Sequence, residues 1–205
     1  VASLVGSEMC IRDSTEGGLW GKLTGVSVSI VAVFVIFGAI LNAGEAGQGF
    51  MNIAIAGAGR LKGGAAKVSV ISSALFGSIS GSASANVAST GMVTLPTMIK
   101  LGYSKKIAGA VEAVASTGGQ IMPPLMGAGA FVMVELTGIP YSQIIMAAFI
   151  PALLYFFAIW LGVNRYAELY DLKPYKVEML PQISTVIKTA LFFLIPFSVL
   201  LAFMY

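Results

Sequence analysis

Two polar stretches hold the side chains of this sequence that could bind an ion: GSISGSASANVASTG at residues 77–91 and STGGQIMPP at residues 116–124. Hydroxyl, amide and backbone carbonyl oxygens are the ligands that hard cations prefer. Such oxygens recur in both stretches, so the sequence predicts a site for Na⁺. The candidate ligands are the side chains of Ser80, Ser82, Asn86, Ser116 and Thr117, with backbone carbonyls around Gly81 and Gly118.

Composition excludes most other chemistry. The chain contains no His and a single Cys, so it can form no Ser-His-Asp or Cys-His catalytic group, no Cys/His metal site and no internal disulfide. We therefore expect neither an enzyme nor a transition-metal site. The net charge of +3 comes from short Lys and Arg clusters between apolar segments, a pattern typical of membrane topology and not of nucleic-acid binding.

The segments that must position the polar stretches are those of a membrane protein. The chain is 57% hydrophobic and 10% charged, with a mean hydropathy of +0.89, which predicts an all-α integral membrane fold. Residues 23–43 form an uncharged apolar run long enough for a transmembrane helix. Residues 44–67 mix charged and apolar side chains, which predicts an amphipathic helix at the membrane interface.

Residues 68–99 are predicted to form a re-entrant hairpin. Basic residues, which mark the cytoplasmic side, flank both ends: Arg60, Lys62 and Lys67 before it, and Lys100, Lys105 and Lys106 after it. Two complete crossings would need about forty residues and a turn. The 32 residues available favour two helices of roughly 14 residues each that enter the membrane and return. The tip then falls in the first polar stretch.

A helix over residues 106–138 is predicted to be broken by the second polar stretch. Gly118 and Gly119 loosen a helix, and Pro123 and Pro124 remove two backbone donors. Irregular backbone at membrane depth survives only where protein or water satisfies it, and secondary transporters use it to build ion sites. Residues 144–163 are predicted to span the membrane again, and a last span starts near Thr189.

Alternative interpretations remain open for these residues. A single Ser or Gly could serve only the close packing of membrane helices, and Asn86 is balanced between packing and ion binding. Glu112 could be an intramembrane carboxylate that couples transport to an ion or relays a proton. It could equally be an interfacial residue paired with Lys105 or Lys106.

Three long stretches carry a family resemblance: GRLKGGAAKVSVISSALFGSISGSASANVASTG, GYSKKIAGAVEAVASTGGQIMPPLMGAGAFVMVE and GIPYSQIIMAAFIPALLYFFAIW. With them, residues 15–205 resemble the large permease of tripartite ATP-independent periplasmic (TRAP) transporters. They are most similar to the fused-permease branch that works with TAXI-type binding proteins. The resemblance maps SGSASAN onto the first hairpin tip and STGGQIMPP onto the broken helix. It thereby adds Gly119 to the ion-site candidates and implies that Pro123 and Pro124 hold the break open.

The resemblance implies a multi-pass importer of the bacterial inner membrane that works by an elevator mechanism. Na⁺ is the implied coupling ion, and Glu112 keeps H⁺ open as an alternative. A periplasmic TAXI-type binding protein would deliver an organic acid anion, and a small membrane subunit would be fused to the large one. The hairpin and broken helix of this chain correspond to the first of two inverted repeats.

These expectations divide the chain into four parts. Residues 1–14 resemble a translated sequencing adapter and are set aside as an artefact. Residues 15–67 are a scaffold helix and an interfacial arm helix, residues 68–138 are the transport element, and residues 139–205 are scaffold helices that stop within an apolar run, so we expect a fragment. The competing class is a channel-like or structural membrane subunit with a re-entrant loop. A membrane-embedded enzyme would need a nucleophile and base that the sequence does not offer.

Overall fold

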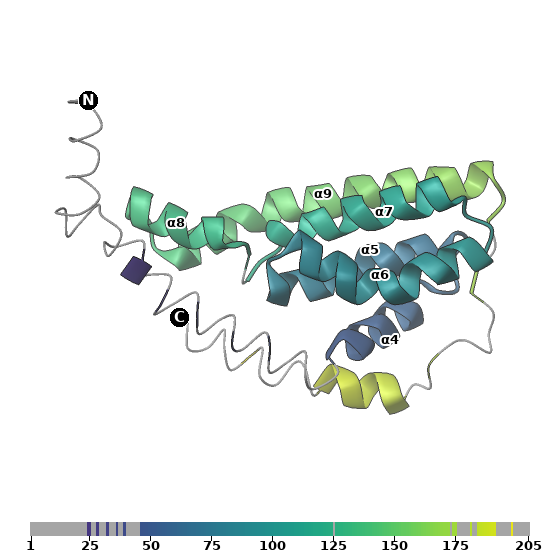
Figure 1. The fold of residues 1–205 in the computed structure, drawn as a ribbon, viewed down its shortest axis with the longest axis horizontal. Helices are drawn as coiled ribbons and strands as arrows, with labels where there is room; N and C mark the ends of the chain where they lie inside the picture. The colour runs from purple at the N-terminus through teal and green to yellow at the C-terminus, as the bar shows by residue number, and fades with distance from the viewer. Residues whose placement is uncertain are drawn as a thin grey trace, which may run out of the picture.

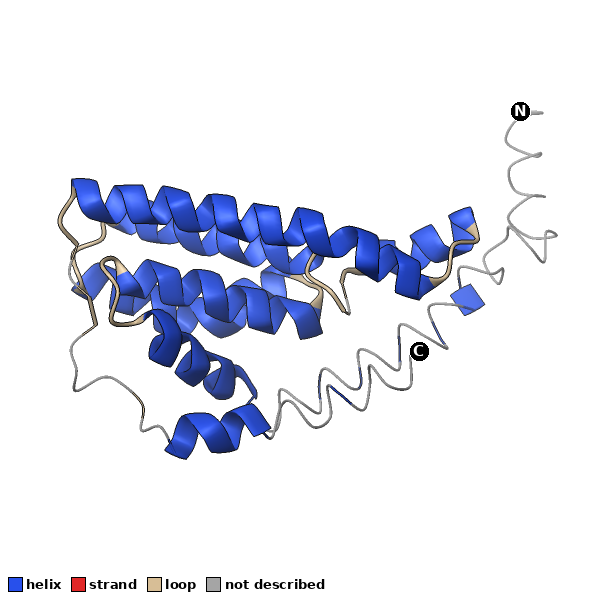
Figure 2. Ribbon diagram, turned by 180° about the vertical axis from the view of Figure 1, so that it is seen from behind, coloured by secondary structure: helices blue, strands red, loops and turns tan. Residues whose placement is uncertain are grey.

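The computed structural model describes residues 46–124, 126–172, 174–175, 181 and 184–191, and single positions between 24 and 39 and at 198. Throughout this part the chain forms helices and connecting turns without strands, in agreement with the predicted all-α class (Figures 1 and 2). The spans predicted over residues 23–43 and from Thr189 onward lie almost wholly outside the described residues.

The first described helix, α4 (Ala46–Ala58), packs against the start of α5 (Gly64–Ser80). Its buried residues Phe50, Ala54 and Ala58 recur every four positions and so form one helix face. The C-terminal bound of the predicted interfacial segment 44–67 is too late, because Gly64–Lys67 already form the first turn of α5.

Lys67 also differs from its expected place at the membrane surface. It is 4% exposed, and its Nζ donates to Asn164 Oδ1 at 2.6 Å and lies 5.2 Å from the centre of the Trp160 ring. An amide oxygen and an aromatic face can hold an ammonium group out of water. Lys67 thus ties α5 to α9 (Tyr141–Leu169) instead of facing the interface.

Helices α5 and α6 (Ala83–Lys100) form a hairpin that turns at Gly81 and Ser82. Gly81 ends α5 with a positive φ of 57°, which glycine adopts without strain, and Ser82 begins α6 by accepting a hydrogen bond from the backbone N–H of Ala85. The helices contain 17 and 18 residues, so each is about 26 Å long. They exceed the predicted 14 residues and remain shorter than a bilayer core of about 30 Å; membrane re-entry stays a prediction.

The helix expected over residues 106–138 is interrupted between α7 (Lys105–Thr117) and α8 (Ala128–Thr137). A short 3₁₀ turn, η2 (Gly118–Gln120), follows α7, and the peptide between Pro123 and Pro124 is cis. The backbone N–H of Gly127 donates to the carbonyl of Gln120 at 2.9 Å and closes the loop. The second polar stretch therefore forms a compact break between two helices.

Helix α9 (Tyr141–Leu169) runs beside α7 and is the described helix that is long and apolar enough to cross a membrane (Figure 1). It covers the span predicted over residues 144–163 and extends beyond it at both ends. Large apolar side chains are exposed along its surface: Met146, Phe149, Ile150, Leu153, Leu154, Phe157 and Leu161. Such a surface suits lipid or a further helix of the same protein.

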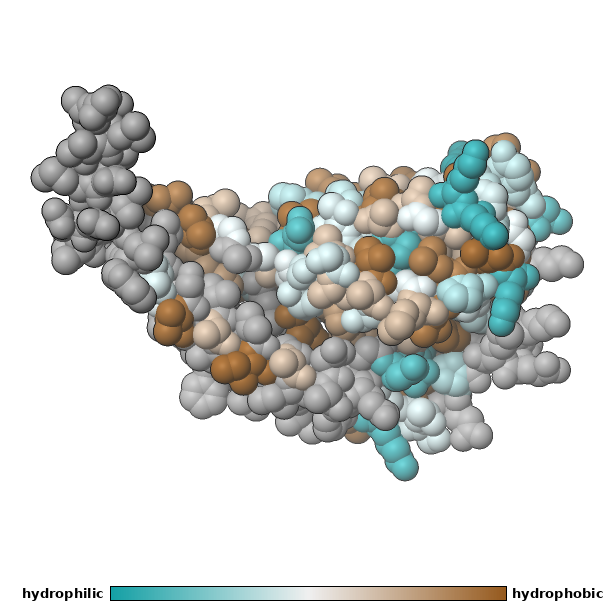
Figure 3. Space-filling model, viewed as in Figure 1, coloured by the Kyte–Doolittle hydropathy of each residue, from teal (hydrophilic) through white to brown (hydrophobic). Residues whose placement is uncertain are grey.

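Several exposed basic residues lie at one end of the bundle, where α5 begins and α6 and α9 end, and Figure 3 shows hydrophilic side chains at this end. Hydrogen bonds from Gly63 N–H to the Leu172 carbonyl and from Tyr175 N–H to the Gly59 carbonyl join the loops there. The exposed basic residues of this region are Arg60, Lys62, Lys100, Lys105, Lys106 and Arg165. The predicted topology places these residues together on the cytoplasmic side of the membrane, and their position at one end of the bundle is compatible with it.

Candidate ion site at the hairpin turn and helix break

The hairpin turn packs directly onto the helix break. A Cβ atom built on Gly77 would collide with the Cα of Gly119, and one built on Gly81 would collide with the carbonyl of Met126. Only glycine allows two backbones to approach so closely. The two polar stretches, which are separated by the 24 residues 92–115, thus form one continuous region, as the sequence hypothesis requires.

Asn86 connects the three helices of this region. Its side chain is fully buried, and its Nδ2 donates to the carbonyl of Ser73 on α5 at 2.9 Å and to the carbonyl of Ser116 on α7 at 3.5 Å. A buried amide is costly unless it is hydrogen-bonded, and here both donors of the amide are used. Asn86 therefore holds the hairpin against the end of α7.

The other predicted ligands have different surroundings. The Oγ of Ser80 is buried and has no hydrogen-bond partner within the described part of the chain. The Oγ of Ser82 lies at the start of α6, 3.2 Å from Ser84 Oγ. Thr117 is exposed and donates to the carbonyl of Ala113 in its own helix, so its hydroxyl proton is already used. Gly118 is buried against the ring of Tyr155.

Pro123 and Pro124 are both buried within the break. The carbonyl of Pro124 accepts a hydrogen bond from the hydroxyl of Tyr141 at 2.6 Å, which fastens the break to the first turn of α9. The break is therefore supported from two sides, by the hairpin and by α9.

Helix ends of both polarities meet at this place. Helices α5 and α7 end there, and their C-termini carry partial negative charge that favours a cation. Helices α6 and α8 begin there, and their N-termini favour an anion. The region can thus serve a cation and an anion side by side, which is the arrangement found where broken helices form transporter sites.

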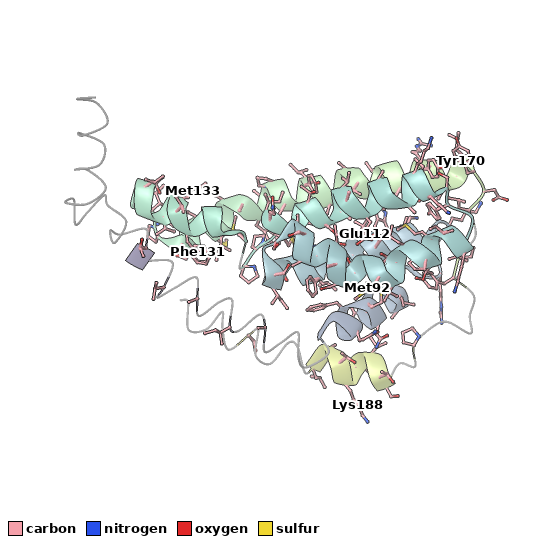
Figure 4. The ribbon with its side chains drawn as sticks, in the orientation of Figure 1. Met92, Glu112, Phe131, Met133, Tyr170 and Lys188 are labelled. Carbon is pink, nitrogen blue, oxygen red and sulfur yellow. The ribbon has the colours of Figure 1, made fainter. Side chains whose placement is uncertain are left out.

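Glu112 lies deeper in the bundle, between α7 and α6, and is 1% exposed (Figure 4). Its carboxylate accepts hydrogen bonds from hydroxyls on all three surrounding helices: Ser69 Oγ at 2.8 Å, Thr90 Oγ1 at 2.5 Å, Thr94 Oγ1 at 2.5 Å and Ser116 Oγ at 3.4 Å. Lys105 and Lys106 are exposed. The interpretation of Glu112 as an interfacial residue paired with one of these lysines is therefore wrong.

Sequence reasoning missed Ser69, Thr90 and Thr94 as partners of Glu112. It predicted Ser116 as an ion ligand, whereas the Oγ of Ser116 donates to Glu112 at 3.4 Å. The signal was a spacing of four residues, which places side chains on one face of a helix. Asn86, Thr90 and Thr94 share such a face on α6, and Glu112 and Ser116 share one on α7.

Comparison with known proteins identifies the family. The family model described as "Tripartite ATP-independent periplasmic transporter, DctM component" matches residues 8–205. The chain belongs to this family. The resemblance to a TRAP large permease is thereby confirmed, and with it the expectation of a membrane transport component and not an enzyme. The family also favours the transporter interpretation over the channel-like one.

Several relatives are similar over part of their length. The chain is 30% identical over 148 residues to the uncharacterized protein YgiK of Salmonella typhimurium, covering 71% of this chain and 33% of that protein. It is 30% identical over 127 residues to the C4-dicarboxylate TRAP transporter large permease protein DctM of Vibrio cholerae, covering 60% and 27%. It is 33% identical over 97 residues to the isethionate TRAP transporter permease protein DctMQ of Oleidesulfovibrio alaskensis, covering 47% and 15%. The chain thus matches a third or less of the length of each relative.

Two finer expectations stay predictions. The family match does not single out the fused branch with TAXI-type binding proteins. It includes residues 8–14, so it gives no support to the assignment of residues 1–14 to an adapter, which rests on the sequence pattern alone.

Proposed function

We propose that this chain is part of a secondary active importer of organic acid anions, in which the hairpin turn and the helix break bind a coupling Na⁺. Membership of the TRAP family supports the transport function. The printed names of two relatives, a C4-dicarboxylate permease and an isethionate permease, support the substrate class. The importer would lie in the bacterial inner membrane and receive its substrate from a periplasmic binding protein of the TAXI type.

The small membrane subunit of such a system would be fused to the large one, for which the relative named DctMQ gives some support. Helices α5 to α8 would form the transport element and α9 part of the scaffold. The contact of Lys67 with Asn164 would then join the two, and it would have to break when the element moves. The second inverted repeat would complete the substrate site.

The observation that carries the ion site is the packing of the turn onto the break beside the Oγ of Ser80. This hydroxyl is buried without a partner in the described part of the chain, and a buried polar atom normally has one. A bound cation would satisfy it, at the place where the C-termini of α5 and α7 supply partial negative charge. Carbonyls around Gly81 and Gly118 would supply further oxygens, with Gly119 allowing the close approach.

The test is Na⁺-driven uptake by a permease of full family length that carries this sequence. It is reconstituted in proteoliposomes with its binding protein. Ser80→Ala removes a ligand but no hydrogen bond of the chain itself. The loss of one ligand is expected to raise the Na⁺ concentration for half-maximal uptake about tenfold. Ser78→Ala is the matched control, because Ser78 lies on the same helix and its Oγ donates to the carbonyl of Leu75 at 2.7 Å.

Asn86→Ala and Ser82→Ala are expected to abolish Na⁺-dependent uptake while expression persists. The first is less clean, because it also removes the two hydrogen bonds that hold α6 to α5 and α7. Unchanged Na⁺ dependence in both Ser80→Ala and Ser82→Ala would contradict an ion site at the turn.

A further inference from the structure

An apolar groove of about 280 Å³ lies between α7 and α9. The two helices run in opposite directions, because α7 begins and α9 ends at the basic end of the bundle. Tyr103 and Tyr166 lie at that end of the groove, with their ring centres 6.1 Å apart. The apolar walls that extend from there include Ile107, Val111, Val114, Ile159, Gly162 and Val163.

The groove is open space and not a contact between the two helices. A Cβ atom built on Gly162 would have no atom of the described residues within 4 Å. Three of the lining residues are exposed: Ala110, Val114 and Gly162. An exposed apolar hollow of this kind on a membrane protein is filled by a lipid tail or by an apolar segment of protein.

The length of the groove favours a lipid tail over a helix. Ile107 and Val114 lie two helical turns apart on α7, which is about 10 Å along the helix axis. Just beyond, the hydroxyl of Tyr155 donates to the Val114 carbonyl at 2.8 Å and joins α9 to α7. One leaflet contributes about 15 Å of the hydrocarbon core, so the groove fits within a single leaflet. A spanning helix would need a surface about twice as long.

Positive charge lies beside the groove at its basic end. Lys106 precedes Ala110 by one turn of α7, and Arg165 follows Gly162 by nearly one turn of α9, so each basic residue is a surface neighbour of a lining residue. Both basic side chains are exposed. The N-terminus of α7 adds partial positive charge at the same end. These charges complement the phosphate of a lipid headgroup.

The acidic neighbour of Arg165 does not prevent this contact. Arg165 Nη1 lies 3.5 Å from Glu168 Oε2, and the two side chains are 83% and 47% exposed. An ion pair so exposed is weak. Glu168 also accepts a hydrogen bond from Asn164 Nδ2 at 2.6 Å, so it keeps a partner when Arg165 turns to a phosphate.

We propose that the groove between α7 and α9 binds an anionic phospholipid from the leaflet at the basic end. One acyl chain lies against Val111 and Gly162, and the phosphate lies between Lys106 and Arg165. A consequence for transport rests on the proposed function, in which α7 belongs to the transport element and α9 to the scaffold. The lipid then lies across the boundary between the two parts, so that the rate of uptake depends on anionic lipid.

Native mass spectrometry of a permease of full family length tests binding without any transport. The probes are phosphatidylglycerol, which is anionic, and phosphatidylcholine with the same acyl chains, which has no net charge. We expect phosphatidylglycerol to bind about tenfold more tightly or better, because two basic side chains contact its headgroup.

Two kinds of variant separate the chain contact from the headgroup contact. Gly162→Leu fills the groove and is expected to weaken the binding of both lipids about tenfold or more. Gly109→Leu is its matched control, because Gly109 is exposed on α7, has equally open space and does not line the groove. Lys106→Gln and Arg165→Gln should each weaken only phosphatidylglycerol binding, about fivefold. Lys188→Gln is the charge control, because Lys188 lies beyond α4, away from α7 and α9 (Figure 4).

Equal binding of the two lipids, or binding that Gly162→Leu does not weaken, overturns the proposal. A lower unfolding temperature of Gly162→Leu than of Gly109→Leu in lipid-free detergent also overturns it, because protein then fills the groove. Na⁺-driven uptake in phosphatidylcholine proteoliposomes should rise with added phosphatidylglycerol in the wild type and not in Gly162→Leu. Uptake that ignores phosphatidylglycerol refutes only the consequence for transport. If Na⁺ drives no uptake in any lipid, the proposed function fails while the binding data still decide the lipid site.

Discussion

The substitution Gly119→Ala tests the contact on which the ion site depends. A Cβ atom at residue 119 would lie 2.8 Å from the Cα of Gly77 and 2.8 Å from the Nδ2 of Asn86. Ordinary contacts of such atoms begin near 3.4 Å, so the neighbours must move apart by about 0.6 Å. One neighbour is backbone and the other is an amide held by hydrogen bonds, and neither can swing aside.

The displacement has a calculable effect on Asn86. Its hydrogen bond to the Ser116 carbonyl is already 3.5 Å long, and a further 0.6 Å would break it. Overpacking costs about 1–3 kcal/mol and the lost hydrogen bond about 1 kcal/mol. Replacing glycine with alanine also reduces the conformational entropy of the unfolded chain, which stabilises the folded state by about 0.4–1 kcal/mol. We therefore expect a net loss of about 1–3.5 kcal/mol of stability.

The assay is thermal unfolding in detergent, together with Na⁺-driven uptake in proteoliposomes. Gly109→Ala is the matched control, because nothing lies within 4 Å of a Cβ at that exposed position on α7. The control should unfold at or above the wild-type temperature, and Gly119→Ala several degrees below it with weaker Na⁺ dependence. If Gly119→Ala is as stable as the control and keeps full Na⁺ dependence, the hairpin and the break do not touch as described.

Three further predictions concern the support of the site. Tyr141→Phe removes the 2.6 Å hydrogen bond to the carbonyl of Pro124 and should lower stability by about 1 kcal/mol in the same unfolding assay. Lys67→Met removes the contact with Asn164 and should lower the unfolding temperature, measured by the intrinsic tryptophan fluorescence. Burial raises the pKa of Tyr103 to about 12, so the unfolded chain loses this proton first and stability should fall between about pH 10 and pH 12. Tyr103→Phe should make unfolding in this alkaline range less dependent on pH.

Local signals explain why the turn and the break could be found in the sequence. Gly81 needs a positive φ at the end of α5, and Ser82 is a favoured first residue for the helix that follows. Pro123 and Pro124 cannot continue a helix. Each of these effects acts within a few residues of chain, so the sequence is enough to locate it.

Contacts between distant residues were beyond the same reasoning. Lys67 looked like a surface cation because its neighbours in sequence include Arg60 and Lys62, and its partner Asn164 lies 97 residues away. Glu112 looked as much like an interfacial residue as a buried one, because three of its four hydroxyl partners come from two other helices. The local sequence pattern does not reveal which helix faces pack against each other. Whether a side chain such as that of Lys67 or Glu112 is buried depends on this packing.

Close packing of small residues was the main alternative to an ion site, and it accounts for only part of the region. It explains Gly77, Gly118 and Gly119, whose missing side chains let backbones and rings approach. It also suits hydroxyls such as that of Ser78, which bond back to their own helix. Packing does not require a buried hydroxyl without a partner at Ser80, nor a carboxylate surrounded by hydroxyls at Glu112. A buried hydroxyl without a partner and a buried carboxylate both lower the stability of the fold, and close helix packing does not need either of them. A function in transport therefore explains these two residues better than packing does.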